Sequence, residues 1–365
     1  MTVYLDYASS TPTSEAVLEA FLQAERAYIG NPMSTHGVGE KARDELSRVT
    51  GSIADMLGVS PPEIIFTSGA TEANNLAIKG IAHTYKYQGR HILSTCLEHP
   101  SVSGTLTALQ NAGYEIELLK ILPDGTIDLA YLESAIRADT ILVCVSTVDS
   151  ELGAIQPIVE ISKIVGGRHL HVDAAQAMGK IPVEIAGAST LSFSPHKFYG
   201  LCGSGILVKR DGVVLEPQIH GGRSTTIYRS GTPTLSLAAA CEKALELVLS
   251  NQAEWLAKVT NLKSYLLNGL RDRVRINSTA TGSPYILNLS VKGIKATQIV
   301  AELSRRGICV SAKSACSTDN SPSRPVMAIT RDKQNALSSW RISLSHLTKT
   351  AELDILLSAI KDISI

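Results

Sequence analysis

Short hydrophobic runs alternate with segments of helical periodicity along much of the chain. Between about residues 60 and 210, segments in which apolar residues recur every three or four positions predict helices at 71–83, 101–112 and 157–165. The short apolar runs between them predict buried strands at 63–66, 92–95, 141–145, 169–172, 191–194 and 205–208. Such alternation is typical of an α/β fold, in which helices cover both faces of a mostly parallel sheet.

The C-terminal part of the chain predicts a second, smaller lobe. A long helical pattern from Leu235 to about Tyr265 leads into it. Beyond this helix, the pattern predicts strands at 286–291 and 309–310 and helices at 295–306 and 351–361. The segment 314–325 is rich in Ser, Asp, Asn and Pro, which predicts a loop.

The composition favours a globular enzyme without a nucleic-acid or membrane surface. The 365 residues are 44% hydrophobic, and 34 Lys and Arg balance 34 Asp and Glu. No apolar run approaches the roughly 18–20 residues of a membrane span, and the first residues do not resemble a signal peptide, so we expect a cytoplasmic protein. None of the six cysteines forms a CxxC pair, which indicates neither a zinc site nor a disulfide framework. Cys144 lies in an apolar run and is expected in the core.

Residues that can carry chemistry come just after the predicted strands, where ligands of such sheets bind. They are Thr71, His99, Ser150, Asp173 and Lys197. A lysine about two dozen residues after a strand-end aspartate suits the cofactor pyridoxal 5'-phosphate (PLP). The lysine forms a Schiff base with the cofactor aldehyde, and the aspartate keeps the pyridine nitrogen protonated. Taken alone, however, Lys197 is more often a surface lysine and Asp173 a helix cap.

Two further segments each have a functional and a purely structural interpretation. The segment 68–71 joins a strand to a helix, where free backbone N–H groups bind phosphate and Gly69 allows close approach. It is equally compatible with an ordinary hydroxyl N-cap. Cys316 lies in the polar 314–325 loop, where an exposed thiol can reach a substrate. The alternative is a free surface cysteine.

Motifs in a fixed order run along nearly the whole chain. They are Tyr4–Ala8, Gly30–Pro32, Phe66–Glu72, Glu98–Val102, His171–Gln176, Ser194–Lys197, His220–Gly222, Arg229–Thr232, Ser314–Ser317 and Arg341–Ser343. In this order and spacing the chain resembles the class V aminotransferase-like, PLP-dependent enzymes, and among them the cysteine desulfurases of the NifS/IscS type.

This resemblance implies PLP-dependent transferase fold type I, the aspartate-aminotransferase-like fold. A large PLP-binding domain with a mostly parallel, seven-stranded sheet is expected at 15–251. A smaller α+β domain, made of 1–14 and 252–365, is expected to carry the loop of Cys316.

The resemblance also assigns residues to the cofactor. The implied contacts are Ala70, Thr71, Ser194 and His196 at the phosphate, Asp173 at the pyridine nitrogen, Gln176 at the phenolic oxygen, His99 stacked on the ring and Lys197 at the aldehyde. Thr232 of the partner subunit would add a phosphate contact, which implies a homodimer with shared active sites. Ser150 stands where the family has an asparagine that touches cofactor and substrate.

The implied reaction converts L-cysteine to L-alanine and leaves a persulfide on Cys316. Lys197 would take the α-proton, and His99 would assist with protons. Arg341 would grip the substrate carboxylate, and Asn31 would be a second substrate-binding residue. The sulfur would then pass to an acceptor protein or a reductant, for iron–sulfur cluster assembly or a thiolation pathway.

The chain departs from the family pattern at several positions. Ser150 is shorter than the usual asparagine, which leaves its contact with cofactor and substrate open. Cys202 is a second thiol near the site, and we interpret it as a packing substitution. Ser345 and His346 replace a Gly-Arg pair, so the local loop geometry is expected to differ. The chain ends at Ile365, sooner than members that dock a scaffold protein, so such docking stays open.

Two alternatives to the desulfurase also stay open. One is another reaction on the same cofactor, such as that of a selenocysteine lyase, a cysteine-sulfinate desulfinase or an aminotransferase, the last of which would not need Cys316. The other is a degenerate member that acts as a sulfur-trafficking scaffold. Retention of the cofactor residues counts against the scaffold.

Overall fold

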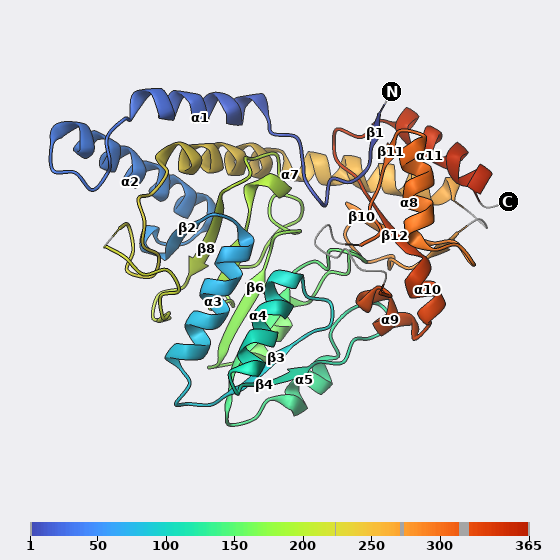
Figure 1. Cartoon of the computed structure of the whole chain (residues 1–365), viewed down its shortest axis with the longest axis horizontal. Helices are drawn as coiled ribbons and strands as arrows, with labels where there is room; N and C mark the ends of the chain where they lie inside the picture. Colours follow the sequence, from blue (N-terminus) through green and yellow to red (C-terminus); the bar gives the residue numbers. More distant parts are fainter. Residues whose placement is uncertain (1, 223, 271–273, 314–320, 364–365) are drawn as a thin grey trace.

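A computed structural model describes residues 2–222, 224–270, 274–313 and 321–363, which form a large and a small lobe (Figure 1). The large lobe contains a seven-stranded sheet of order β2-β8-β7-β6-β5-β3-β4. Its strands are β2 (Ile64–Thr67), β3 (His91–Ser94), β4 (Glu115–Leu118), β5 (Thr140–Ser146), β6 (His169–Asp173), β7 (Thr190–Phe193) and β8 (Gly205–Lys209). Among these strands, β8 alone runs opposite to the other six. The mostly parallel seven-stranded sheet and the α/β fold class are thereby confirmed.

Alternate side chains of the central strand β5 enter two separate hydrophobic clusters, one on each face of the sheet. Leu142 and Cys144 pack with helices α3 (Ala70–Thr84) and α4 (Pro100–Asn111). Val143 and Val145 pack with the opposite cluster. That cluster includes residues of α1 (Glu15–Ala27), α2 (Gly37–Leu57), α5 (Leu129–Ala135), α6 (Ile158–Val165) and α7 (Leu235–Gly269). Cys144 is fully buried, as its apolar run predicted.

Helix α7 connects the two lobes because its two halves enter different cores. Its first half, around Leu245 and Val248, packs in the large lobe, and Val259, Leu262 and Leu266 pack in the small one. The expected domain boundary at 251/252 falls within this unbroken helix. The boundary therefore stays a prediction. Within the described residues, no helix is long and apolar enough to cross a membrane.

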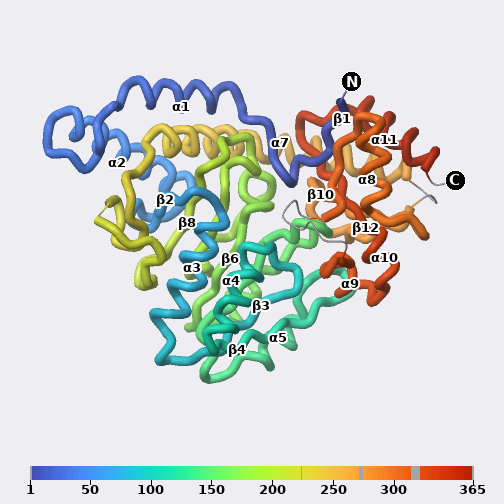
Figure 2. Tube along the Cα trace, in the orientation of Figure 1, coloured from blue at the N-terminus to red at the C-terminus, as the bar shows by residue number. Residues whose placement is uncertain are grey.

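The small lobe is built from short strands and four helices of the described chain. Strand β10 (Ile286–Ser290) pairs with β9 (Arg275–Ile276) and β12 (Ser339–Ser343), and β1 (Val3–Tyr4) pairs in parallel with β11 (Ile308–Cys309). The helices are α8 (Ala296–Arg305), α9 (Arg324–Thr330), α10 (Lys333–Ser338) and α11 (Thr350–Ile363). Figure 2 shows the N-terminal segment leaving this lobe and crossing to α1 on the large lobe.

The carboxyl ends of five strands meet at one edge of the large sheet and position the candidate site there. Strand β2 runs antiparallel to β8, and β8 antiparallel to β7, so β2 points the same way as β7, β6, β5 and β3. Asp173 ends β6, and Lys197 ends the short 3₁₀ helix η2 (Pro195–Lys197) after β7. A second 3₁₀ helix, η1 (Pro61–Glu63), precedes β2.

Tyr199 ties the loop after Lys197 to the small lobe. Its backbone adopts φ 67°, a left-handed conformation that costs a non-glycine residue energy. Its hydroxyl lies 2.7 Å from the Ser345 hydroxyl, and its ring packs edge-on against Trp255 and His346, which stack on each other with ring centroids 3.5 Å apart. The Ser345–His346 pair, which departs from the family pattern, therefore makes a local contact of its own with the lysine loop.

Gly205 provides a test of how closely β8 approaches the start of α3. A Cβ on Gly205 would lie 2.5 Å from the backbone carbonyl carbon of Gly69, so Gly205→Ala must displace that backbone. We expect a loss of about 1–3 kcal/mol in the free energy of unfolding, measured by urea denaturation. Gly104→Ala is the matched control, because a Cβ there meets nothing within 4 Å and replaces a helical glycine. Gly104→Ala should raise the free energy of unfolding by up to about 1 kcal/mol. Equal urea midpoints for the two variants would contradict the close packing of Gly205 against Gly69.

Candidate active site

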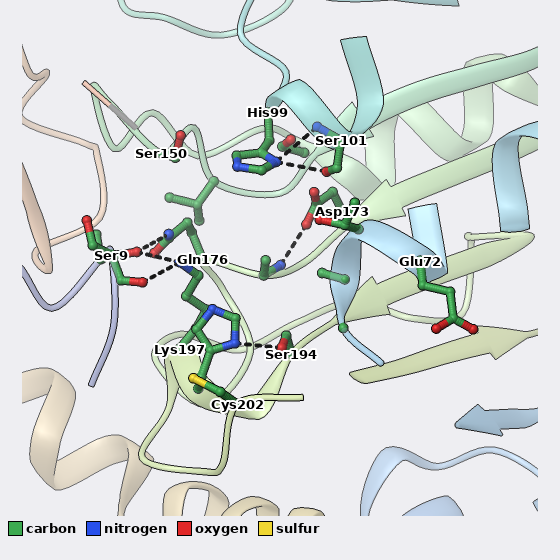
Figure 3. Close-up of a pocket in the computed structure, with 18 of the residues that line it drawn as sticks. Ser9, Glu72, His99, Ser101, Ser150, Asp173, Gln176, Ser194, Lys197 and Cys202 are labelled. Atoms are coloured by element: carbon green, nitrogen blue, oxygen red, sulfur yellow. Dashed lines mark hydrogen bonds between the residues drawn. The ribbon is translucent and has the colours of Figure 1, made fainter. Parts of the chain in front are cut away.

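A cavity of about 300 Å³ opens at the carboxyl edge of the sheet (Figure 3). The sequence-predicted residues that line it are Ala70, Thr71, His99, Ser150, Asp173, Gln176, Ser194, His196, Lys197 and Arg341. They come from both lobes and from loops far apart in the sequence. Ten of the predicted site residues therefore line one cavity.

The Lys197 ammonium group is held by backbone oxygens of the N-terminal segment. Its Nζ donates to the carbonyls of Ser9, at 2.7 Å, and Ala8, at 3.0 Å. These two residues also line the cavity. The amine is therefore kept within the cavity by acceptors that carry no full charge, and it remains able to exchange partners.

Asp173 is buried at the end of β6 and both of its carboxylate oxygens accept hydrogen bonds. Oδ1 accepts from the backbone N–H of Ala175 and Oδ2 from Nδ2 of Asn74, each at 2.9 Å. These two donors fix the orientation of the carboxyl group. A fixed carboxylate on the cavity wall suits a cationic ring nitrogen.

His99 caps helix α4 and presents its ring to the cavity. Its Nδ1 accepts a hydrogen bond from the backbone N–H of Ser101 at 3.1 Å and lies 2.8 Å from the Ser101 hydroxyl. Burial lowers its pKa, although the Asp173 carboxylate acts in the opposite sense. The ring is therefore neutral near pH 7, and because Nδ1 is an acceptor its proton lies on Nε2.

One end of the cavity suits a phosphate group. The N-terminus of α3 lies at Ala70, and the first N–H groups of a helix have no intrahelical acceptor. Ser194 and His196 face the same end, with the Ser194 hydroxyl donating to the Ser204 carbonyl at 2.8 Å and lying 2.7 Å from Nδ1 of His196. Burial lowers the pKa of His196 to about 4, so a bound phosphate dianion would be needed to favour its protonated form.

Gln176 is oriented by a lysine that the sequence did not single out. Lys180 is buried and its Nζ donates to Oε1 of Gln176 at 2.8 Å. The amide nitrogen of Gln176 therefore points the other way and donates to the Ala8 carbonyl at 2.8 Å. This orientation gives the cavity a hydrogen-bond donor, which suits a phenolic oxygen.

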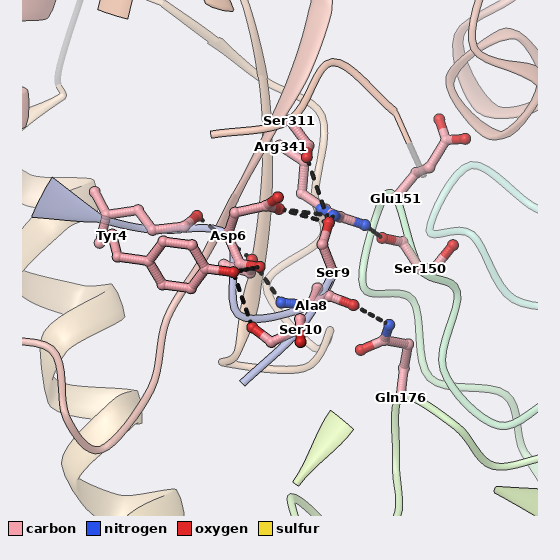
Figure 4. Close-up of polar contacts among 12 residues, drawn as sticks. Tyr4, Asp6, Ala8, Ser9, Ser10, Ser150, Glu151, Gln176, Ser311 and Arg341 are labelled. Atoms are coloured by element: carbon pink, nitrogen blue, oxygen red, sulfur yellow. Dashed lines mark hydrogen bonds and ion pairs between the residues drawn. The ribbon is translucent and has the colours of Figure 1, made fainter. Parts of the chain in front are cut away.

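The Arg341 guanidinium is buried, lines the cavity and is paired with the N-terminal segment (Figure 4). Its Nη2 donates to Oδ1 of Asp6 at 2.9 Å and to Oγ of Ser9 at 2.7 Å, and its Nη1 donates to the carbonyl of Ser150 at 2.8 Å. Nε makes no hydrogen bond with any described residue. Ser150 thus contributes its backbone, which any residue at that position provides.

Two of the sequence-predicted residues lie outside the cavity, and a third falls outside the described residues. Asn31 is exposed, and its Oδ1 accepts from the N–H of Met33 at 2.9 Å. Thr232 is exposed on the segment before α7. Cys316, with the rest of Ser314–Ser317, lies outside the described residues. Cys202 lines the cavity and is exposed, so our interpretation of it as a packing substitution is wrong; its loop ends at the cavity edge, where no core surrounds it.

Buried carboxyl groups lie behind His99. Glu98 accepts hydrogen bonds from the hydroxyls of Ser146, at 2.6 Å, and Thr95, at 2.7 Å. Burial nevertheless raises its pKa to about 7. Burial, with the Glu151 charge, raises the pKa of Asp149 to about 7 as well. Removing a carboxylate from water is the dominant effect in both.

Glu98 makes stability depend on pH in a defined direction. Because its pKa is higher folded than unfolded, the folded state binds more protons between the ordinary carboxyl pKa and about 7, and stability falls as pH rises through that window. We expect Glu98→Gln to remove part of this decline, on the order of 1–3 kcal/mol in unfolding free energy, measured by urea denaturation at pH 5 and pH 8. The control is Glu19→Gln on the exposed face of α1. An unchanged slope in Glu98→Gln would refute the assignment.

The whole chain is similar to known proteins of one family. The family model described as aminotransferase class-V matches residues 3–356. The cysteine desulfurase IscS of Glaesserella parasuis serovar 5 (strain SH0165) is 36% identical over 374 residues, which cover 98% of this chain and 92% of that protein.

Solved structures give the same picture. A NifS-like protein superposes with a TM-score of 0.93 at 33% identity, covering 100% of this chain and 99% of its own. SspA, solved in complex with cysteine, superposes with a TM-score of 0.84 at 31% identity, covering 94% and 99%.

Proposed function

The chain belongs to the aminotransferase class-V family, and from that premise we propose how its residues act in a PLP-dependent cysteine desulfurase. Its substrate is L-cysteine and its products are L-alanine and enzyme-bound sulfur. The observation that carries this assignment is the single cavity that brings the Lys197 amine, the Asp173 carboxylate and the N-terminus of α3 together. These groups match the aldehyde, the ring nitrogen and the phosphate of PLP.

Bound PLP would draw electrons away from the substrate carbon next to the amino group. Lys197 would hold the cofactor aldehyde and later take and return the proton at the substrate α-carbon. Asp173 would keep the pyridine nitrogen protonated, and the Gln176 amide would donate to the phenolic oxygen. His99, neutral with its proton on Nε2, would cover the ring and exclude water from it.

Arg341 would bind the substrate carboxylate at the cavity mouth. Bidentate capture needs two neighbouring N–H groups of the guanidinium. Nη2 already faces Asp6 and Ser9, and of these two only Ser9 lines the cavity. The Ser9 hydroxyl would therefore yield its place to a carboxylate oxygen, while Asp6 keeps the guanidinium in position. Asn31, which is exposed, would assist only if a partner subunit or a chain movement brings it to the site.

Cys316 would accept the sulfur as a thiolate nucleophile. Its sulfur forms a bond to the substrate sulfur as the carbon–sulfur bond of cysteine breaks. The electron pair of that bond stays on carbon, which takes up a proton and becomes the methyl group of alanine. The product on the enzyme is a persulfide, which an acceptor protein or a thiol reductant removes, in the cytoplasm, for iron–sulfur cluster assembly or thiolation.

A homodimer with shared active sites accounts for the position of Thr232. This residue is exposed outside its own chain's cavity, where it can reach a neighbouring subunit. Six of the exposed large apolar side chains lie on two segments: Leu22, Ile29, Met33 and Val38 are in or between α1 and α2, and Ile219 and Ile227 precede α7. Such surfaces favour contact with another protein surface.

Loss of the Cys316 thiol should abolish turnover while leaving the cofactor bound. We expect Cys316→Ala to form alanine from L-cysteine, in the presence of a thiol reductant, at least about 100-fold more slowly than the wild type. Cys202→Ala is the matched control, because that thiol lines the cavity, and it should retain most activity. Full activity in Cys316→Ala would favour an aminotransferase-type reaction, and loss confined to Cys202→Ala would move the sulfur acceptor to that residue.

Shared sites can be tested by mixing two inactive variants. Lys197→Ala lacks the amine, and Thr232→Glu places a carboxylate where the partner's phosphate would bind. Each alone should be inactive. A co-expressed heterodimer contains one site with wild-type Lys197 and wild-type Thr232, so activity should return to up to about half of the wild type per dimer. If Thr232 served its own chain's site, no mixed dimer would have an intact site and no activity would return.

A further inference from the structure

Asn74 lies outside the cavity but is bonded to two of its residues. It is fully buried on α3, beneath the cavity wall formed by Ser101 and Asp173. Its Nδ2 donates to Oγ of Ser101 at 2.8 Å and to Oδ2 of Asp173 at 2.9 Å. Its Oδ1 accepts from Nε2 of His171 at 2.9 Å and from the hydroxyl of Ser192. Both hydrogens and both lone pairs of the amide are used.

The direction of each bond follows from its neighbours. An ionised Asp173 can only accept, so the atom of Asn74 that faces it is the nitrogen. Ser101 then accepts from Asn74, which leaves its own single hydrogen for Nδ1 of His99, 2.8 Å away. The buried chain Asp173–Asn74–Ser101–His99 therefore has one consistent pattern of donors and acceptors.

The support behind Asn74 is rigid. His171 is fully buried, and burial lowers its pKa to about 4, so its neutral ring has one proton to donate. That proton lies on Nε2, because the amide oxygen of Asn74, 2.9 Å away, can only accept. The Thr190 hydroxyl, 2.9 Å from the other ring nitrogen, can then donate to it. Strands β6 and β7 thus anchor the oxygen side of the amide, and its nitrogen side is fixed toward the cavity.

We propose that Asn74 is a positioning residue. It would hold the Asp173 carboxylate directly and the His99 ring through Ser101, and so fix the positions of these two side chains relative to each other. One amide would set the carboxylate that meets the ring nitrogen of PLP and the imidazole that covers the ring. A purely structural asparagine would satisfy its partners without preference for the cavity. Here both hydrogens of the amide end on cavity residues. The inference rests on the roles proposed above for Asp173 and His99.

The two arms of Asn74 can be separated by substitution. Ser101→Ala removes the hydroxyl through which Asn74 reaches His99, but it keeps the backbone N–H that also donates to Nδ1 of His99 and the bond from Asn74 to Asp173. Asn74→Ala removes both arms. Asn75→Ala is the matched control on the same helix, because among the described residues its amide donates only to the carbonyl of Thr71, at 3.0 Å. Cofactor dissociation constants, kcat and KM for L-cysteine, and the unfolding midpoint of the cofactor-free protein are measured for each variant beside the wild type.

We expect Asn74→Ala to weaken PLP binding about 10- to 100-fold, as the loss of a buried hydrogen bond to a charged group does, and to lower kcat. Ser101→Ala should lower kcat about tenfold at nearly unchanged KM and leave PLP affinity within about twofold of the wild type. In the double variant the loss in kcat should be smaller than the product of the two single losses, because both act through one path. Asn75→Ala should match the wild type in each.

Wild-type PLP affinity and kcat in a folded Asn74→Ala variant would overturn the proposal. If that variant does not fold, the Ser101→Ala variant tests the proposal. An unchanged kcat in Ser101→Ala would overturn the proposal, and so would a loss of PLP affinity as large as the loss in kcat. Multiplicative losses in the double variant would do the same. A wild type that binds PLP but forms no alanine would instead refute the proposed reaction and leave the PLP-affinity comparison valid.

Discussion

A guanidinium group and an ammonium group from different lobes face one cavity, and the segment Asp6–Ser9 holds both. The carbonyls of Ala8 and Ser9 accept from Lys197, while the side chains of Asp6 and Ser9 accept from Arg341. The segment is itself fixed to the small lobe, since the N–H of Ala8 donates to the Ser343 hydroxyl at 2.9 Å. The spacing between the two cations therefore depends on a few residues at the start of the chain.

The charges around the cavity favour anionic ligands. Burial and the nearby positive charges of Lys197 and Arg341 lower the pKa of Lys180 to about 7. Such crowding of cations is costly in a protein without its ligands. A phosphate group and a substrate carboxylate would relieve it, and they would do so more strongly because Lys180 and Arg341 are buried. The same feature thus destabilises the empty site and strengthens binding.

The sequence predicted the parts of the fold that depend on local pattern. Buried strands such as β5 and β6 show as apolar runs, and the residues at their ends could be placed at one sheet edge. Strand β4 was not predicted, because it is an edge strand whose side chains are largely exposed and so form no apolar run. Helices α1 and α2 were not predicted either. Ten candidate site residues do line the cavity, whereas Asn31 and Thr232 do not within one chain.

The residues that sequence reasoning missed act over long separations. Asn74 meets Asp173 across 99 residues, and Asp6 meets Arg341 across 335. No local pattern reports such contacts, because a buried amide or an N-terminal carboxylate has no periodic signature. A polar residue at a position that the helical pattern assigns to the core would have been the only local signal, and Asn74 meets that description.

Chemical trapping can show whether the cavity binds PLP through Lys197. The purified protein with PLP would be treated with sodium borohydride, which makes the bond between the cofactor aldehyde and a lysine permanent, and digested for peptide mass spectrometry. We expect one modified lysine, Lys197, and no modification in Lys197→Ala. A label on Lys180 or on a surface lysine instead, or no label from protein that binds PLP, would contradict the assignment of Lys197 as the lysine that holds PLP.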